Sequence, residues 1–158
     1  MEMQPHSEPD VLPTHGVLLG VDFGTKRLGV SVCDRNQKFA SPLQNQQRQG
    51  PNGDARFFRK IIEEFHPVGI VVGLPVHMSG DESKKSREAR AFGQWLHQTT
   101  ELPVGYFDER YTTALADGLL FQTDMTARQR KAKRDKLAAQ ILLQNFLNSR
   151  SATDTDAG

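Results

Sequence analysis

The sequence predicts an α/β fold in which helices cover both faces of a mixed, five-stranded sheet. The first observation is that two apolar runs, 17–22 and 28–33, are separated by only five residues, so they pair as an antiparallel hairpin. The second is that apolar runs then alternate with helical patterns, which is typical of parallel strands joined by helices.

The length and composition are those of one ordinary domain. The chain has 158 residues and a formal net charge of +1, so binding to nucleic acid would depend on local basic clusters. Cys33 is the single cysteine, which excludes a disulfide within the chain and a cysteine-based zinc site. No apolar run approaches the ~20 residues of a membrane span, and the first residues lack a signal-peptide pattern. We therefore expect a cytoplasmic protein that does not contact a membrane.

Polar residues at both ends predict where the domain begins and ends. Residues 1–15 include three prolines and are expected to form a disordered leader. Residues 150–158 are expected to form a disordered tail. The remaining segment, 16–149, then forms a single domain.

The elements that follow the hairpin begin with a short strand. We expect it around residues 38–43, where Pro42 restricts it to a sheet edge or a strand end. The polar, glutamine-rich segment 44–53 is expected to be a loop. A helix with an apolar stripe then begins at Asp54, with Asn52 or Asp54 itself as the N-cap.

The second half of the chain alternates strands and helices. The continuous apolar run 68–73 is typical of a central strand that is covered on both faces. A helix is expected over 83–98 and a strand over 103–107. Another helix begins at residue 112 or 113, and the last one spans 135–148.

Acidic residues follow the ends of two predicted strands. Asp22 ends the first strand, and Asp108 and Glu109 follow the last one. The carboxyl ends of parallel strands meet at one edge of a sheet, so Asp22 is expected near one of the other two acids. Neighbouring strand residues point to opposite faces, so spacing alone leaves the choice between Asp108 and Glu109 open. Asp22 could also merely cap the turn that follows it.

A third acid, Asp135, opens the last helix. It shares a helical face with Ala138, Ala139 and Leu142, and this apolar face must pack on the sheet. Asp135 is therefore expected to point inward, where small alanines permit close approach. On spacing alone it could equally be an N-cap that stabilises the helix by ~1 kcal/mol.

Inward-pointing acids that lie together repel each other unless a cation compensates them. Their oxygen ligands favour Mg²⁺ or Mn²⁺ over zinc. The sequence therefore predicts a divalent metal site at the edge of the sheet.

Four blocks of the chain, in order, resemble the YqgF family, whose members are described as pre-16S rRNA nucleases and as Holliday-junction-resolvase-like proteins. The blocks are residues 20–30 (GVDFGTKRLGV), 72–75 (VGLP, with Met78 and Gly80), 108–113 (DERYTT) and the helix that starts at Asp135. The resemblance covers residues 16–148 and implies a ribonuclease H-like fold.

The resemblance also implies a site and an activity. It favours Glu109 over Asp108 and gives a catalytic, metal-binding triad of Asp22, Glu109 and Asp135. The implied activity is metal-dependent hydrolysis of phosphodiester bonds, with two Mg²⁺ or Mn²⁺ ions ~4 Å apart and Asp22 between them. The implied role is processing of the 5′ end of pre-16S rRNA in ribosome biogenesis, with the ribosomal subunit as a candidate partner of a monomer or homodimer.

Basic residues lie near all three acids in the sequence. The candidates for binding nucleic acid are Lys26, Arg27, Arg110, Lys133 and Arg134. A charge run on its own is usually only a solvated segment, but beside a metal site it suits the binding of a polyanion. His77, in the loop after the central strand, is either a proton-transfer residue or a loop residue without function.

Three other functions compete with this interpretation. A resolvase that acts on four-way DNA junctions would use the same acids and metals. A sugar kinase or actin-like protein has a similar strand-Asp-x-Gly-Thr turn, but it needs two such domains. A non-catalytic nucleic-acid-binding module would carry the acids only as structural residues.

Overall fold

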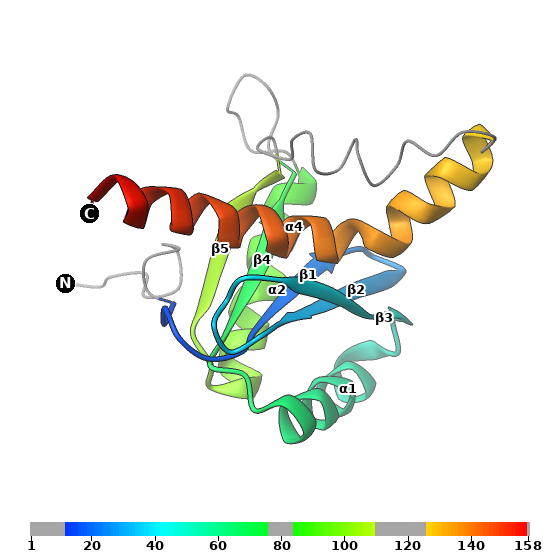
Figure 1. Cartoon of the computed structure of the whole chain (residues 1–158). Coiled ribbons are helices and arrows are strands. Elements are labelled where there is room, and N and C mark those ends of the chain that lie inside the picture. The colour runs from blue at the N-terminus through cyan, green and yellow to red at the C-terminus, as the bar shows by residue number, and fades with distance from the viewer. Residues whose placement is uncertain (1–11, 76–83, 110–125, 158) are drawn as a thin grey trace.

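The computed structural model describes residues 12–75, 84–109 and 126–157, without the side chains of residues 130–136 and 152–157 (Figure 1). Its elements in chain order are β1 (Leu18–Phe23), β2 (Arg27–Cys33), β3 (Ala40–Gln47), α1 (Gly50–Phe65), β4 (Gly69–Leu74), α2 (Lys84–Thr100), β5 (Val104–Asp108) and α4 (Ala127–Ala157). The helix predicted to begin at residue 112 or 113 and the loop that contains His77 lie outside the described residues. No helix in the described part is both long enough and apolar enough to cross a bilayer.

The five strands form one mixed sheet in the order β3-β2-β1-β4-β5. β1 and β2 form the predicted antiparallel hairpin, and β3 adds an antiparallel edge strand. β1, β4 and β5 run parallel to one another. The predicted mixed, five-stranded sheet is confirmed, and the carboxyl ends of three parallel strands lie at one edge.

Helices cover both faces of this sheet, as predicted (Figure 1). α1 and α2 pack on one face, where Phe58, Phe92 and Leu96 belong to a large apolar cluster with alternate strand residues. α4 crosses the other face, and its residues Leu143 and Phe146 belong to a second, smaller cluster. The last helix of the chain therefore contacts the strands that are made first.

The glutamine-rich segment 44–53 is not the predicted loop. β3 continues to Gln47, and α1 begins at Gly50. A polar sequence can form this strand because β3 is an edge strand that is largely exposed to solvent. The predicted helix start at Asp54 is also wrong, because this side chain is buried within α1 and the N-cap residue is Gln49.

The ends of the described chain contact each other. The helix predicted over 135–148 is α4, which is longer in both directions, at Ala127–Ala157. Leu12 lies in the predicted leader, yet its side chain is buried. Arg150 lies in the predicted tail, and its guanidinium donates hydrogen bonds to the carbonyl oxygens of Leu12 and Pro13 at 3.0 and 3.3 Å.

Candidate active site

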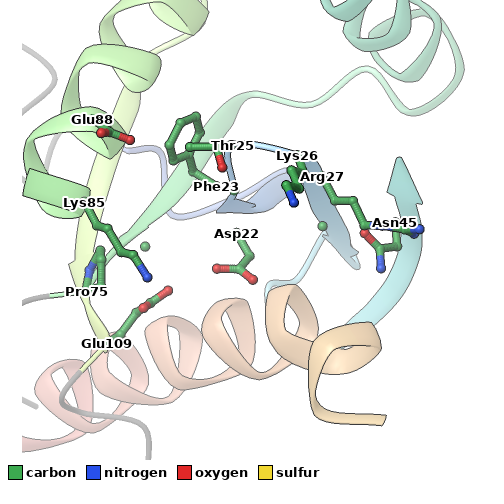
Figure 2. Close-up of a pocket in the computed structure, with 13 residues that line it drawn as sticks. Asp22, Phe23, Thr25, Lys26, Arg27, Asn45, Pro75, Lys85, Glu88 and Glu109 are labelled. Atoms are coloured by element: carbon green, nitrogen blue, oxygen red, sulfur yellow. The ribbon is translucent and has the colours of Figure 1, made fainter. Parts of the chain in front are cut away.

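A hollow of about 500 Å³ lies at the edge of the sheet where β1, β4 and β5 end (Figure 2). The turn between β1 and β2 and the first turns of α2 contribute to its walls. Four of the residues singled out in the sequence line it, namely Asp22, Lys26, Arg27 and Glu109. The hollow is therefore the place where the predicted acids and cations meet.

Asp22 and Glu109 approach each other because the strand between them carries a glycine. β4 lies between β1 and β5, and its Gly73 is level with Asp22 in the sheet register. A Cβ atom on Gly73 would lie 2.5 Å from Oε1 of Glu109, so a larger residue would displace that carboxyl group. Gly73 thus leaves room for Glu109 over β4. Of the two adjacent acids that spacing could not separate, Glu109 is the one that lines the hollow.

The two carboxyl groups interact with each other. Burial of the Glu109 carboxyl, the charge of Asp22, a hydrogen bond with Asp22 and the charge of Asp108 together raise the pKa of Glu109 to about 7, and burial is the largest of these causes. Without another ligand, Glu109 therefore holds its proton to a higher pH than an exposed carboxyl group does. A cation would stabilise the doubly ionised pair, because it would compensate the repulsion that keeps this proton bound.

The third predicted acid is placed by its helix. Asp135 belongs to α4, one turn before Ala139, and its side chain is not among those described. The Ser31 hydroxyl donates a 2.7 Å hydrogen bond to the Ala139 carbonyl oxygen. A Cβ atom on Gly29 would lie 3.6 Å from the Cβ atoms of both Ala139 and Asp22. The helix backbone therefore passes close to Asp22. Asp135 lies before Ala139 in α4, about 6 Å from it along the helix axis.

Three basic side chains line the hollow. Lys26 and Arg27 come from the turn that follows Asp22, as the sequence suggested. Lys85 comes from the first turns of α2, and Figure 2 shows its amine pointing toward Asp22 and Glu109. The hollow therefore receives cations from two separate parts of the chain.

Three of the predicted cations have no described side chain. Arg110 lies outside the described residues. Lys133 and Arg134 belong to α4, close in sequence to Asp135, but their side chains are not described. Their roles stay predictions from the sequence.

Three lining residues were not expected from the sequence. Lys85 and Glu88 are three residues apart at the start of α2, so they share one face of that helix. The loop before α2 leaves β4 at the edge that carries the acids, which is a signal that could have identified them. Asn45 pairs with Gly29 in the strand register. It lines the hollow because β3 continues past residue 43, where the sequence predicted a loop.

The donor set fits a hard divalent cation. Asp22 and Glu109 offer carboxylate oxygens, which Mg²⁺ and Mn²⁺ prefer. Among the described side chains, no three of the metal-binding types lie together, and this set does not include the side chain of Asp135. The two described acids would supply two of the three predicted ligands.

The chain is similar to known proteins over most of its length. A family model described as "RuvX: Holliday junction resolvase" matches residues 16–149. A Rhodopirellula baltica protein named "Putative pre-16S rRNA nuclease" is 42% identical over 140 residues, which cover 89% of this chain and 81% of that protein. A protein of the same name from Cereibacter sphaeroides is 40% identical over 137 residues, which cover 87% and 86% of the two chains.

A solved structure supports the fold. RuvC of Thermus thermophilus in complex with a Holliday junction substrate matches with a TM-score of 0.55 and 13% identity, over 88% of this chain and 98% of that one. At this identity the match concerns the fold alone. Resolvases of this type have a ribonuclease H-like fold, so the ribonuclease H-like fold implied by the sequence blocks is confirmed.

Proposed function

Because the chain belongs to the RuvX family, also called YqgF, we propose that it is a nuclease that hydrolyses phosphodiester bonds, with pre-16S rRNA as its substrate. The relatives that share about 40% of its sequence are named for this activity. In this role the protein would act in the cytoplasm and contact the precursor, alone or within a ribosomal subunit.

The observation that carries the proposal is the pair of carboxyl groups in a hollow lined by cations. Asp22 and Glu109 share a hydrogen bond, and the pKa of Glu109 is raised to about 7. Such a pair has little structural value, because its repulsion opposes folding. It suits a site that binds a divalent cation together with a phosphate.

In this proposal the acids of the hollow would bind metal and its basic residues would bind phosphate. Asp22 would be shared by two ions, and Glu109 and Asp135 would each hold one of them. When bound, Mg²⁺ or Mn²⁺ supplies a lowered pKa for water and stabilises negative charge on the phosphate oxygens. Lys26, Arg27 and Lys85, which line the same hollow as the acidic pair, would bind and orient the phosphate backbone.

A four-way DNA junction is the second candidate substrate. The matching family model carries the description of a Holliday junction resolvase, and this is the observation that favours it. The same acids and metals would serve both substrates, so the choice depends on the shape of the nucleic acid that the surface accepts.

The test is a cleavage assay on two substrates in parallel. Purified protein is incubated with a labelled 16S rRNA precursor and with a labelled four-way junction, in Mg²⁺, in Mn²⁺ and in EDTA. The test variant is Asp22→Asn. The matched control is Glu63→Gln, which neutralises an exposed acid of α1 far from the hollow in sequence.

We expect metal-dependent cleavage of the rRNA precursor, unchanged in Glu63→Gln. In Asp22→Asn the rate should fall about 10²–10³-fold, since lost electrostatic stabilisation of a transition state has that size. Cleavage of the junction alone would replace the rRNA proposal by the resolvase. Tight RNA binding without cleavage in any metal would contradict the nuclease and indicate a binding module.

A further inference from the structure

Arg48 lies behind the wall of the hollow and contacts several of the elements that form it. It is the residue directly after β3, in the segment that the sequence suggested was a loop. Its side chain is 26% exposed, so it is neither a core residue nor a free surface cation. Its contacts reach the end of β1, the β1–β2 turn and α2.

Two hydrogen bonds tie Arg48 to the β1–β2 turn. The guanidinium Nη1 donates to the carbonyl oxygen of Gly24 at 3.1 Å. The backbone N–H of Arg48 donates to the carbonyl oxygen of Lys26 at 2.8 Å. Both acceptors belong to the turn whose side chains Lys26 and Arg27 line the hollow.

The guanidinium group of Arg48 lies over two aromatic rings. Its central carbon is 5.3 Å from the ring centre of Phe23 and 5.2 Å from that of Phe92. The two rings are themselves 4.9 Å apart. Phe23 follows Asp22 directly, and Phe92 belongs to α2, the helix that brings Lys85 into the hollow. Arg48 therefore contacts both elements that supply cations to the site.

A buried acid fixes the position of Arg48. Nε of Arg48 lies 2.8 Å from Oδ2 of Asp54, whose side chain is only 1% exposed. The other oxygen, Oδ1, accepts a hydrogen bond from the backbone N–H of Gln49 at 2.9 Å. A buried carboxylate needs such partners, because an unpaired charge in the interior is very costly. Asp54 thus fixes the guanidinium group, which in turn donates a hydrogen bond to the β1–β2 turn.

The turn itself has little room to adjust. A Cβ atom on Gly24 would lie 2.6 Å from the carbonyl oxygen of Arg27, so the two ends of the turn pass very close to each other. We call the two hydrogen bonds from Arg48 to the carbonyl groups of Gly24 and Lys26 the clamp. The clamp fixes the backbone positions from which the side chains of Lys26 and Arg27 extend.

We propose that Arg48 and Asp54 are positioning residues that fix the β1–β2 turn, so that Lys26 and Arg27 are already in place when the phosphate backbone binds. The inference rests on the proposed function, since it concerns how that same site binds nucleic acid. Arg48 itself does not line the hollow and acts through the turn.

Lysine cannot replace arginine in this role. A lysine can still pair with Asp54, but it lacks the planar fork that bonds Asp54 and Gly24 together while lying over two rings. Arg48→Lys therefore removes the side-chain bond to Gly24 and the planar group over the rings without leaving a buried charge unpaired, while the backbone bond to Lys26 remains. A second variant, Arg48→Met combined with Asp54→Asn, removes both charges and tests the same point. Arg59→Lys, at an exposed arginine of α1, is the matched control.

The first measurement reports on the turn alone. Limited digestion with trypsin, followed by mass spectrometry, gives the rate of cleavage after Lys26 and Arg27 in the native protein and in each variant. Thermal unfolding of the same samples shows whether a variant is folded. We expect cleavage at the turn to be about tenfold faster in both clamp variants and unchanged in Arg59→Lys, since the loss of one hydrogen bond of about 1.4 kcal/mol shifts an equilibrium tenfold.

The second measurement links the turn to nucleic acid. The Kd for the labelled 16S rRNA precursor is measured in EDTA, where no cleavage occurs, for Arg48→Lys, Lys26→Ala and the double variant. We expect Arg48→Lys to weaken binding roughly tenfold and to weaken it much less when Lys26 is already absent. Such non-additivity is what a residue that acts through Lys26 produces, whereas a general loss of stability would add to the effect of Lys26→Ala.

The outcomes separate the inference from the function on which it rests. Unchanged cleavage at the turn in folded variants would overturn the inference, and so would faster cleavage with an unchanged Kd. If the native protein binds neither the rRNA precursor nor a four-way junction, the proposed function fails. In that case faster cleavage at the turn would still support the clamp and slower or equal cleavage would refute it.

Discussion

The sheet face under α1 and α2 packs large side chains throughout, whereas the part of the other face that lies beneath Ala139 of α4 packs glycine and serine against the helix. On the first face, Phe58 is fully buried and Phe92 nearly so. On the second, Gly20 leaves room for Leu143, and Ser31 bonds to the helix carbonyl of Ala139. Burial of large apolar side chains contributes most to stability. Small residues and hydrogen bonds contribute less, but they fix the distance and register of the helix that carries Asp135.

The comparison predicts that the first face can be weakened without changing the site. Phe58→Ala should lower the free energy of unfolding by about 3–5 kcal/mol, because it leaves a cavity in the larger core. Denaturant unfolding measures this loss. The affinity of the folded protein for Mn²⁺ should change less than twofold, and a large change would show that the two faces are not separate.

The second effect depends on pH and concerns the edge of the α4 face. The pKa of Glu109 is raised from 4.5 to about 7 in the folded chain, so folding favours its protonated form. The stability that this proton provides is complete below about pH 4.5 and is lost as the pH rises through about 7. The free energy of unfolding of the metal-free protein should therefore decline between about pH 4.5 and pH 7.

Asp22→Asn is the control for that decline. It removes the charge and the carboxylate hydrogen bond that raise the pKa of Glu109, but burial, the largest cause, remains. The decline should therefore become smaller without disappearing. A decline of the same size in Asp22→Asn would mean that the two carboxyl groups do not interact.

A smaller change on the α4 face should affect the site more than stability suggests. In Gly20→Ala, the new Cβ atom would lie 2.5 Å from Oγ of Ser31 and 2.8 Å from Cβ of Leu143. Such overpacking costs about 1–3 kcal/mol and pushes the helix outward. Mn²⁺ affinity should fall at least tenfold, in contrast to Phe58→Ala. An unchanged affinity would contradict the positioning role of this face.

Ser31→Ala should have a milder effect in the same direction. It removes the 2.7 Å hydrogen bond to Ala139 without adding volume, which typically costs about 1 kcal/mol. We expect a small loss of stability and a detectable loss of nuclease rate. Cys33→Ala, on the same strand and face, is the control for the loss of one buried side-chain atom that does not contact the helix carbonyl.

The smallest expected effect concerns α2, which covers the first face but reaches the hollow with Lys85. Lys85→Met should reduce the slope of log Kd against log salt by about 0.7–0.9 if this amine neutralises one phosphate. Binding of the rRNA precursor is measured in EDTA over a range of salt concentrations. Lys84→Met, at the adjacent exposed lysine, should leave the slope unchanged.

The hairpin, the mixed sheet and the approach of Asp22 to an acid after the last strand could be predicted because strand ends and parallel connections follow general rules, and the family resemblance identified that acid as Glu109. The extent of β3 could not be predicted. Its sequence is rich in amides because it is an exposed edge strand, and such a sequence looks like that of a loop. Asp54 looked like a helix cap, since a buried partner such as Arg48 leaves no local signal. Lys85 belongs to the site only through the packing of α2 on the sheet.

The contact between Ser31 and Ala139 also bears on how the protein is made. The two residues are 108 positions apart. At synthesis rates of about 5–20 residues per second, the first strands therefore wait on the order of 5–20 s for the helix that covers them. During that time the growing chain has the hairpin and Asp22 but no helix over the glycine-rich face. A nuclease built in this way has no assembled site until α4 has been made and has packed on the sheet.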